Sequence, residues 1–323
     1  MTTAEQGFFA PDSVAWRVLS APATALMIAQ VTNLLEVPHR DFQAVLANHD
    51  PLFPTNRKRQ RASGSDPNTK SGHFHDRLKR TVTIPLPMIF GDKQTAIACA
   101  RRLFNYHRPM HGVEADGETR YAATNPETML FAAITITHAG LIAYEKFAFD
   151  GRRFPGRLSD TDRDQYFAEM TRIAVLMGVP LDKVPSTTAD VDSYYRSISS
   201  EFVTIPGFTA AQRKTALALL RPDGWADVAA TAADILLVLS GILGYAVLPK
   251  PSRRLHGLGA GTDPLFAAIR LSSLPLFALL RVRTVRRTAL SWYVGADEAA
   301  ELERASSMCR TPSHDTVLTA CAQ

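Results

Sequence analysis

One segment in the middle of the chain constrains the fold more than any other. Asn125-Pro126-Glu127 joins a residue that caps helices to a proline at the first helical position. The residues after it, as far as about Phe147, are apolar on nearly every side of a helix. Because such a helix must be surrounded by other parts of the protein, the sequence predicts a central buried helix here.

Helical spacing dominates the rest of the chain, and strand signals are weak. Apolar residues within Val14–Glu36 recur in steps of three and four. Pro22 predicts either a kink in this region or the first turn of a helix that Ser20 caps. Other starts are predicted at Asp92, Ser159 or Asp160, Thr187 with Asp190, Thr209, Trp225 and Asp263.

These patterns predict an all-α protein, a single large helical domain of roughly eight helices. We expect this domain to cover residues 1–305, with a flexible basic loop at about 55–72 and a mobile tail at 306–323. The chain of 323 residues is 46% hydrophobic and 21% charged, which is typical of a soluble protein with a large core.

Charge and cysteine content limit the classes of function. Cys99, Cys309 and Cys321 are too few and too scattered for a disulfide framework or a cysteine-based zinc site, which favours a reducing, cytoplasmic location. The net charge of +5 does not indicate nucleic-acid binding. Basic clusters at Arg57–Arg61 and Arg281–Arg287 leave peripheral contact with an anionic membrane open.

No segment is expected to be a signal peptide or to span a membrane. The start, MTTAEQGFFAPD, has neither a basic nor an apolar signal region. A spanning helix needs about 20 apolar residues. The uncharged apolar runs Ile235–Leu248 and Met129–Ala143 are shorter than that, and both are predicted to be buried core helices.

Common catalytic motifs are absent from the sequence. The glycines of Gly257–Gly261 do not fit a dinucleotide loop, because Thr262 stands where the third glycine belongs. There is no HExxH, GxSxG or CxxC motif, so a serine hydrolase or a typical zinc hydrolase has no support.

A histidine lies on the apolar face of the helix that Asp92 begins. His107 continues the series Ala96, Ala100 and Leu103, at spacings of 4, 3 and 4. It is either a core histidine or an axial ligand of haem iron, which takes a neutral ring nitrogen in an apolar pocket. His111 follows after Pro109, a residue that bends or ends helices.

A basic motif precedes that helix, in the sequence Arg77-Leu78-Lys79-Arg80-Thr81. Arg77, Arg80 and Thr81 share one face if the segment is helical. The motif is either a solvated basic turn or a polar patch in a pocket, able to bind propionates or an oxygen-derived ligand.

The order of these segments resembles the catalytic domain of rubber (latex-clearing) oxygenases and of the mycophenolic-acid-pathway oxygenases. The similar stretch is about His75–Ser197, with weaker similarity in Val18–Asp50 and from Leu248 onward. The motifs that carry it are HDRLKRT at His75–Thr81, FGD at Phe90–Asp92, HRPMHG at His107–Gly112, DGETRYAATNPETML at Asp116–Leu130, AYEKF at Ala143–Phe147 and MGVP at Met177–Pro180.

The resemblance implies an all-α fold that holds haem b in a buried pocket and acts with O₂ or peroxide on an apolar small-molecule substrate. His107 matches the family's histidine motif and would be the axial iron ligand, with His111 as the alternative. Arg77, Arg80 and Thr81 match the family's motif beside the haem and would shape the oxygen-binding side. Arg80 stands where rubber oxygenases can carry lysine, and arginine is a poor iron ligand because it stays protonated.

Two departures separate the chain from rubber oxygenases. Those enzymes place a glutamate upstream of the basic motif, but this chain has none between Glu36 and Glu114, so polyisoprene cleavage by that route is not expected. His138 lies five residues after Ala133, where many members carry a histidine, and therefore on another helix face. It is expected to be a core histidine, with a role in the pocket as the alternative.

Two further functions stay open at the level of sequence. One is a non-enzymatic haem- or lipid-binding helical protein that rests on a membrane through Arg281–Arg287. The other is a non-haem metal enzyme that uses His107, His111 and a carboxylate. The sequence does not specify the substrate, the redox partner or the oligomeric state.

Overall fold

The predicted fold class is confirmed. The structure, a computed structural model, describes residues 7–49, 79–114, 117–151, 153–205 and 228–309. Within these ranges the chain forms thirteen α-helices, four short 3₁₀ turns and one two-stranded antiparallel hairpin. The protein is therefore predominantly helical, and its buried apolar side chains form one core.

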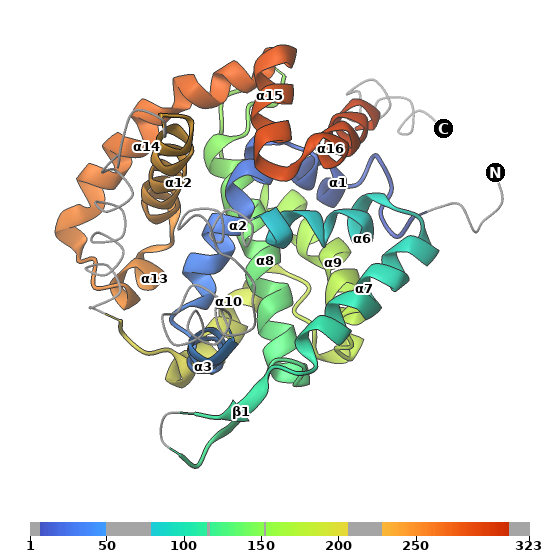
Figure 1. Ribbon diagram of the computed structural model, residues 1–323, viewed down its shortest axis with the longest axis vertical. Coiled ribbons are helices and arrows are strands. Elements are labelled where there is room, and N and C mark those ends of the chain that lie inside the picture. The colour runs from blue at the N-terminus through green and yellow to red at the C-terminus, as the bar shows by residue number, and fades with distance from the viewer. Residues whose placement is uncertain (1–6, 50–78, 115–116, 152, 206–227, 310–323) are drawn as a thin grey trace.

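The helices occupy most of the described residues (Figure 1). They are α1 (Val14–Leu19), α2 (Pro22–Glu36), α3 (Arg40–His49), α6 (Leu86–Phe90), α7 (Lys93–His107), α8 (Pro126–Phe147), α9 (Asp160–Leu176), α10 (Thr188–Ser197), α12 (Val228–Val247), α13 (Lys250–Leu255), α14 (Asp263–Ala278), α15 (Arg283–Val294) and α16 (Ala296–Met308). The hairpin consists of β1 (His111–Val113) and β2 (Arg120–Ala122).

Helix α8 lies at the centre, as its sequence predicts (Figure 1). Asn125 caps its first turn by accepting a hydrogen bond from the backbone N–H of Glu127 at 3.3 Å. Its most extensive neighbour is α2, which is buried along almost its whole length. Helices α1, α9, α12 and α14 also contact α8, so a helix with no polar face has apolar partners on every side.

Pro22 begins a helix instead of kinking one. Helix α1 ends at Leu19, and α2 starts with Pro22 at its first position. The expectation that Ser20 caps α2 is wrong, because Ser20 ends α1 and the residue that precedes α2 is Ala21, whose side chain donates and accepts nothing. Proline lacks an N–H, which the first turn of a helix does not use, so this position costs no hydrogen bond.

Three predicted helix starts are confirmed by their side-chain caps. Asp92 accepts a hydrogen bond from the N–H of Thr95 at 2.7 Å and starts α7. Ser159 caps α9, and Thr187 with Asp190 forms a complete capping box at the start of α10. The predicted helix from Thr209 and the loop at 55–72 lie outside the described residues.

Two helical stretches are long and apolar enough to cross a membrane by length and composition alone. One is Pro126–Phe147, which is the central helix and is 78% buried inside the protein. The other is Ala260–Arg281, which is only 17% buried. The second stretch is not an uncharged run, because Asp263 and Arg270 interrupt it.

Candidate functional site

The basic motif is divided between described and undescribed residues. Arg77 lies outside the described residues. Residues 79–83 are helical and lead into α6, and Arg80 is exposed on this turn. Thr81 is half-buried and lines an internal cavity. Of the predicted patch, therefore, Thr81 faces the interior and Arg80 faces outward.

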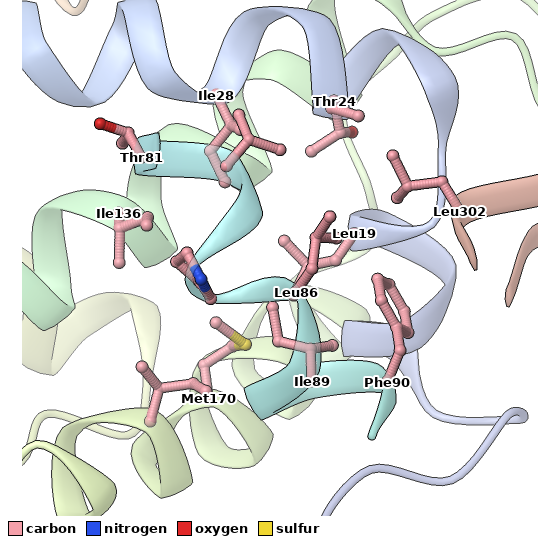
Figure 2. Close-up of a pocket in the computed structure, with 14 residues that line it drawn as sticks. Leu19, Thr24, Ile28, Thr81, Leu86, Ile89, Phe90, Ile136, Met170 and Leu302 are labelled. Atoms are coloured by element: carbon pink, nitrogen blue, oxygen red, sulfur yellow. The ribbon is translucent and has the colours of Figure 1, made fainter. Parts of the chain in front are cut away.

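The cavity beside Thr81 has a volume of about 40 Å³ and is almost entirely apolar. Figure 2 shows side chains that reach it from helices far apart in the sequence. Its walls come from α1, α2, α6, α8, α9 and α16 and from the turn before α6, with Leu19, Thr24, Ala25, Ile28, Thr81, Val82, Pro85, Leu86, Ile89, Phe90, Ile136, Met170, Ile173 and Leu302 as the lining residues. The space is far smaller than a porphyrin and suits only a very small apolar molecule.

Two threonines give this apolar cavity its polar atoms, and Figure 2 labels both. The side chain of Thr24 is buried, and its hydroxyl has no hydrogen-bond partner among the described residues. A buried hydroxyl without a hydrogen-bond partner lowers the stability of the folded protein, so Thr24 destabilises this apolar wall. Thr81 lies on the opposite side of Ile28 in the view of Figure 2.

His107 is the last residue of α7, on the apolar face that the sequence predicts. Ala96 and Ala100 on this face are buried, and the imidazole is half-buried. Its Nδ1 lies 3.0 Å from the carbonyl oxygen of Leu103, one turn earlier. Because a carbonyl oxygen only accepts, Nδ1 carries the proton in this bond and Nε2 keeps its lone pair.

The electrostatics of His107 also suit a metal ligand. Burial lowers the pKa of its imidazole, although the hydrogen bond to Leu103 opposes this shift. The ring is therefore neutral at neutral pH, which is the form that binds a metal. Histidine ligands usually donate their second N–H to a carbonyl or carboxylate, as His107 does to Leu103.

His111 has a different environment, in strand β1 of the hairpin. Its side chain is exposed, and its backbone pairs with Ala122 of β2. Next to it lies His49, from the end of α3, whose Nε2 is 3.1 Å from the hydroxyl of Tyr121. Burial lowers the pKa of His49, and the neighbouring charge of His111 contributes to the shift.

The structure does not bring the predicted residues together in one cavity. Neither His107 nor His111 lines the cavity that holds Thr81. The donor chemistry of His107 fits an axial haem ligand, but the 40 Å³ cavity is not the space for the ring. Among the residues that the structure describes, no group of three His, Cys, Asp or Glu side chains could hold a metal, so these residues do not assemble the non-haem site.

His138 is half-buried among α8, α9 and α10 and does not line this cavity. Its Nδ1 lies 3.4 Å from the hydroxyl of Tyr195 on α10, and its ring contacts Phe167 of α9. Desolvation lowers the pKa of His138 to about 4, with the charge of Arg163 as a smaller cause. The ring is therefore neutral under physiological conditions.

Two buried histidines, His39 and His256, were not singled out from the sequence. His256 is fully buried, and its Nε2 lies 2.7 Å from the carbonyl oxygen of Leu34. His39 is 7% exposed, and the rings of Phe42, Phe131 and Phe202 surround its imidazole. Its Nδ1 has no hydrogen-bond partner among the described residues, and burial lowers its pKa. No spacing pattern marks this site, because Phe131 and Phe202 lie far from His39 in the sequence.

Comparison with known proteins confirms the family that the sequence resembles. A family model described as "ER-bound oxygenase mpaB/B'/Rubber oxygenase, catalytic domain" matches residues 16–282. No curated protein and no solved structure matches the chain significantly. Since the matched residues make up most of the sequence, the chain belongs to the mpaB and rubber oxygenase catalytic-domain family.

Proposed function

We propose that the protein is a haem b-dependent oxidase or oxygenase that acts with O₂ or peroxide on an apolar small-molecule metabolite. The observation that carries the proposal is the geometry of His107 within an oxygenase family. Haem b, when bound, supplies the activation of the oxidant. The remaining contributions come from side chains of the chain itself.

His107 is the residue proposed to hold the iron, and Leu103 is its positioning partner. The hydrogen bond from Nδ1 to the Leu103 carbonyl fixes the rotation of the ring and leaves Nε2 to bind. The bond also raises the basicity of the ring, which opposes the effect of burial on its pKa. His111 is exposed on the hairpin, so it is the weaker candidate.

Thr81 is proposed to serve the oxygen-binding side together with Arg77 and Arg80. A hydroxyl and two guanidinium groups are donors that stabilise negative charge on oxygen. Of these, Thr81 is the residue whose contact with the interior is described, and the walls around it are apolar. Apolar walls exclude water, and a space of about 40 Å³ has room only for a very small apolar molecule such as O₂.

The test is an absorption spectrum of the purified protein before and after reduction with dithionite. We expect a Soret band that shifts on reduction, is lost or strongly weakened in His107→Ala and persists in the matched variant His111→Ala. Retention of the band in His107→Ala with loss in His111→Ala would assign the iron to the hairpin. A colourless protein that added haem does not reconstitute would refute the proposal.

A further inference from the structure

Helix α14 lies at the edge of the molecule (Figure 1). Its outward face is apolar, which is unusual for a surface helix. Leu265, Leu271 and Leu276 are 59%, 54% and 57% exposed. The inward face is apolar too, because Phe266 and Phe277 are buried and Phe277 is part of the core. A surface helix normally presents polar residues to water. In α14 the packing of the protein covers one apolar face and leaves a second apolar face exposed.

The exposed row continues past the end of α14. Leu279 in the 3₁₀ turn and Val282 after it are 49% and 52% exposed. The charged residues of α14 do not interrupt this row, because Asp263 binds Arg253 at 2.6 Å and Arg270 is half-buried. The row therefore runs without an exposed charged side chain along α14, and the exposed Arg281 joins it at the corner before α15.

A basic surface begins directly beyond this corner, on α15. Arg283, Thr284, Arg287, Thr288 and Ser291 line an open depression of about 460 Å³. The side chain of Arg283 is 81% exposed and lies 3.7 Å from Glu303, a carboxylate that Arg286 already binds at 2.6 Å. Arg287 has no acidic partner among the described residues.

The chemistry of this depression fits phosphate groups. Guanidinium groups and hydroxyls are the donors that bind phosphate oxygens, and two arginines one turn apart present them on the same face. Trp292, which is 41% exposed on the same helix, is the side-chain type that concentrates at the boundary between lipid and water.

We propose that the α14–α15 corner docks on an anionic phospholipid membrane. The leucines of α14 enter the outer acyl region, while Arg283 and Arg287 bind lipid phosphates. Charge complementarity favours this occupant, because a membrane surface offers an apolar layer and a phosphate layer side by side, in the arrangement that these two faces require. The helix lies in the surface plane, since its other face packs on α12 and α8.

The first experiment is vesicle flotation with the full chain. We expect binding to vesicles of phosphatidylcholine mixed with phosphatidylserine, weaker binding to phosphatidylcholine alone, and release by salt. Leu271→Gln with Leu276→Gln should weaken binding to the mixed vesicles by about tenfold or more. The matched control is Leu181→Gln, because Leu181 is 63% exposed on a different part of the surface.

The second experiment tests the basic depression. Arg283→Glu with Arg287→Glu should abolish the preference for anionic vesicles, whereas Lys183→Glu with Arg196→Glu changes the net charge equally and should keep it. Circular dichroism of each variant checks that the fold is intact. The proposal rests on surface residues only, so a failed haem spectrum does not affect it.

Three outcomes overturn the proposal. The first is no binding to either kind of vesicle. The second is binding that depends on salt but not on the two leucines, which would mean that no side chain inserts. The third is a dimer in solution that the leucine substitutions dissociate, which would make this face an interface between two copies of the chain.

Discussion

Arg163 binds both carboxylate oxygens of Glu145 through its Nη1, at 2.7 and 2.8 Å, between α9 and α8. The two side chains are 13% and 8% exposed, so the pair is largely removed from water. Glu145 also accepts a hydrogen bond from the backbone N–H of Leu158 at 3.0 Å. This contact fixes the loop before α9 against the central helix.

Removal of one partner of this pair is expected to destabilise the protein strongly. In Arg163→Leu, the Glu145 carboxylate stays buried with only the Leu158 N–H to stabilise its charge, which costs about 3–5 kcal/mol of unfolding free energy. Urea denaturation followed by circular dichroism measures the loss. The double variant Arg163→Leu with Glu145→Gln should recover much of it, because a neutral amide still accepts from Leu158.

The exposed pair Arg157 and Asp160 is the matched control for this prediction. Its side chains are 59% and 80% exposed, and the pair is 2.6 Å apart. Because water screens exposed pairs, Arg157→Leu should leave the free energy of unfolding nearly unchanged. Equal losses in Arg157→Leu and Arg163→Leu would contradict the burial argument.

The lowered pKa of His138 is expected to make the protein less stable at acidic pH. Its pKa is about 4 in the folded protein, because of desolvation, and 6.5 without that burial. Between these values the unfolded chain binds a proton that the folded protein does not, so acidification favours unfolding. Above pH 6.5 the ring is neutral in both states, and His138 does not make stability depend on pH. Below pH 6.5 the free energy of unfolding falls by about 1.4 kcal/mol for each pH unit, to a total loss of about 3 kcal/mol.

The measurement is the free energy of unfolding of the wild type and of His138→Gln between pH 7 and pH 4. Burial also lowers the pKa values of His39, His49, His107 and His256, so the wild type should lose stability from several groups. The difference between the two proteins isolates His138. Parallel pH profiles would mean that His138 is accessible to protons in the folded state.

Alanine substitutions at two glycines of α12 are expected to have opposite effects on stability. A Cβ at Gly244 would lie 2.8 Å from Leu34 Cδ1 and 3.0 Å from Gln30 Cγ, both on α2. Leu34 is fully buried and has no room to move. Gly244→Ala should therefore cost about 1–3 kcal/mol, although alanine is the better helix former.

Gly241→Ala is the matched control, one turn earlier on the same helix. Its Cβ would meet Gln30 Nε2 at 3.5 Å, an ordinary contact. The substitution should be neutral or stabilising, by up to about 1 kcal/mol. Thermal melts of the two variants compare them directly, and a larger loss in Gly241→Ala would show that α12 and α2 do not approach as described.

The sequence predicted the features that depend on neighbouring residues. The caps of α7, α9 and α10 are local hydrogen bonds within four residues, so Asp92, Ser159 and Thr187 marked them. The apolar side of α7 and the central place of α8 followed from spacing and composition. The prediction of about eight helices was too low. Val14–Glu36 forms two helices, α1 and α2, and the helices α3, α6, α13, α15 and α16 were not recognised.

Features built from distant residues were not predictable. The cavity joins Leu19, Ile136 and Leu302, and the aromatic surroundings of His39 join three phenylalanines from different segments. The exposed face of α14 has the same composition as a buried one, so only the packing distinguishes them. The haem ligand and the oxygen-side residues remain predictions that the experiments address.

Substitutions of the two threonines in the cavity, Thr81 and Thr24, can distinguish a catalytic role from a structural one. Thr81→Val removes a donor from the proposed oxygen-binding side and should lower turnover by about a hundredfold, with little effect on haem content. Thr24→Val removes a buried hydroxyl that has no partner among the described residues, so it should raise stability by about 1 kcal/mol and leave turnover unchanged.

Both variants carry the same isosteric change in the walls of the same cavity, which makes each the control of the other. Steady-state oxygen consumption, the Soret absorbance per protein and a urea melt give the three readouts. Thr81→Ser keeps the hydroxyl and should restore most of the turnover. Equal turnover in Thr81→Val and Thr24→Val would show that the Thr81 hydroxyl has no role in the reaction. The two threonines would then differ only in their effect on stability.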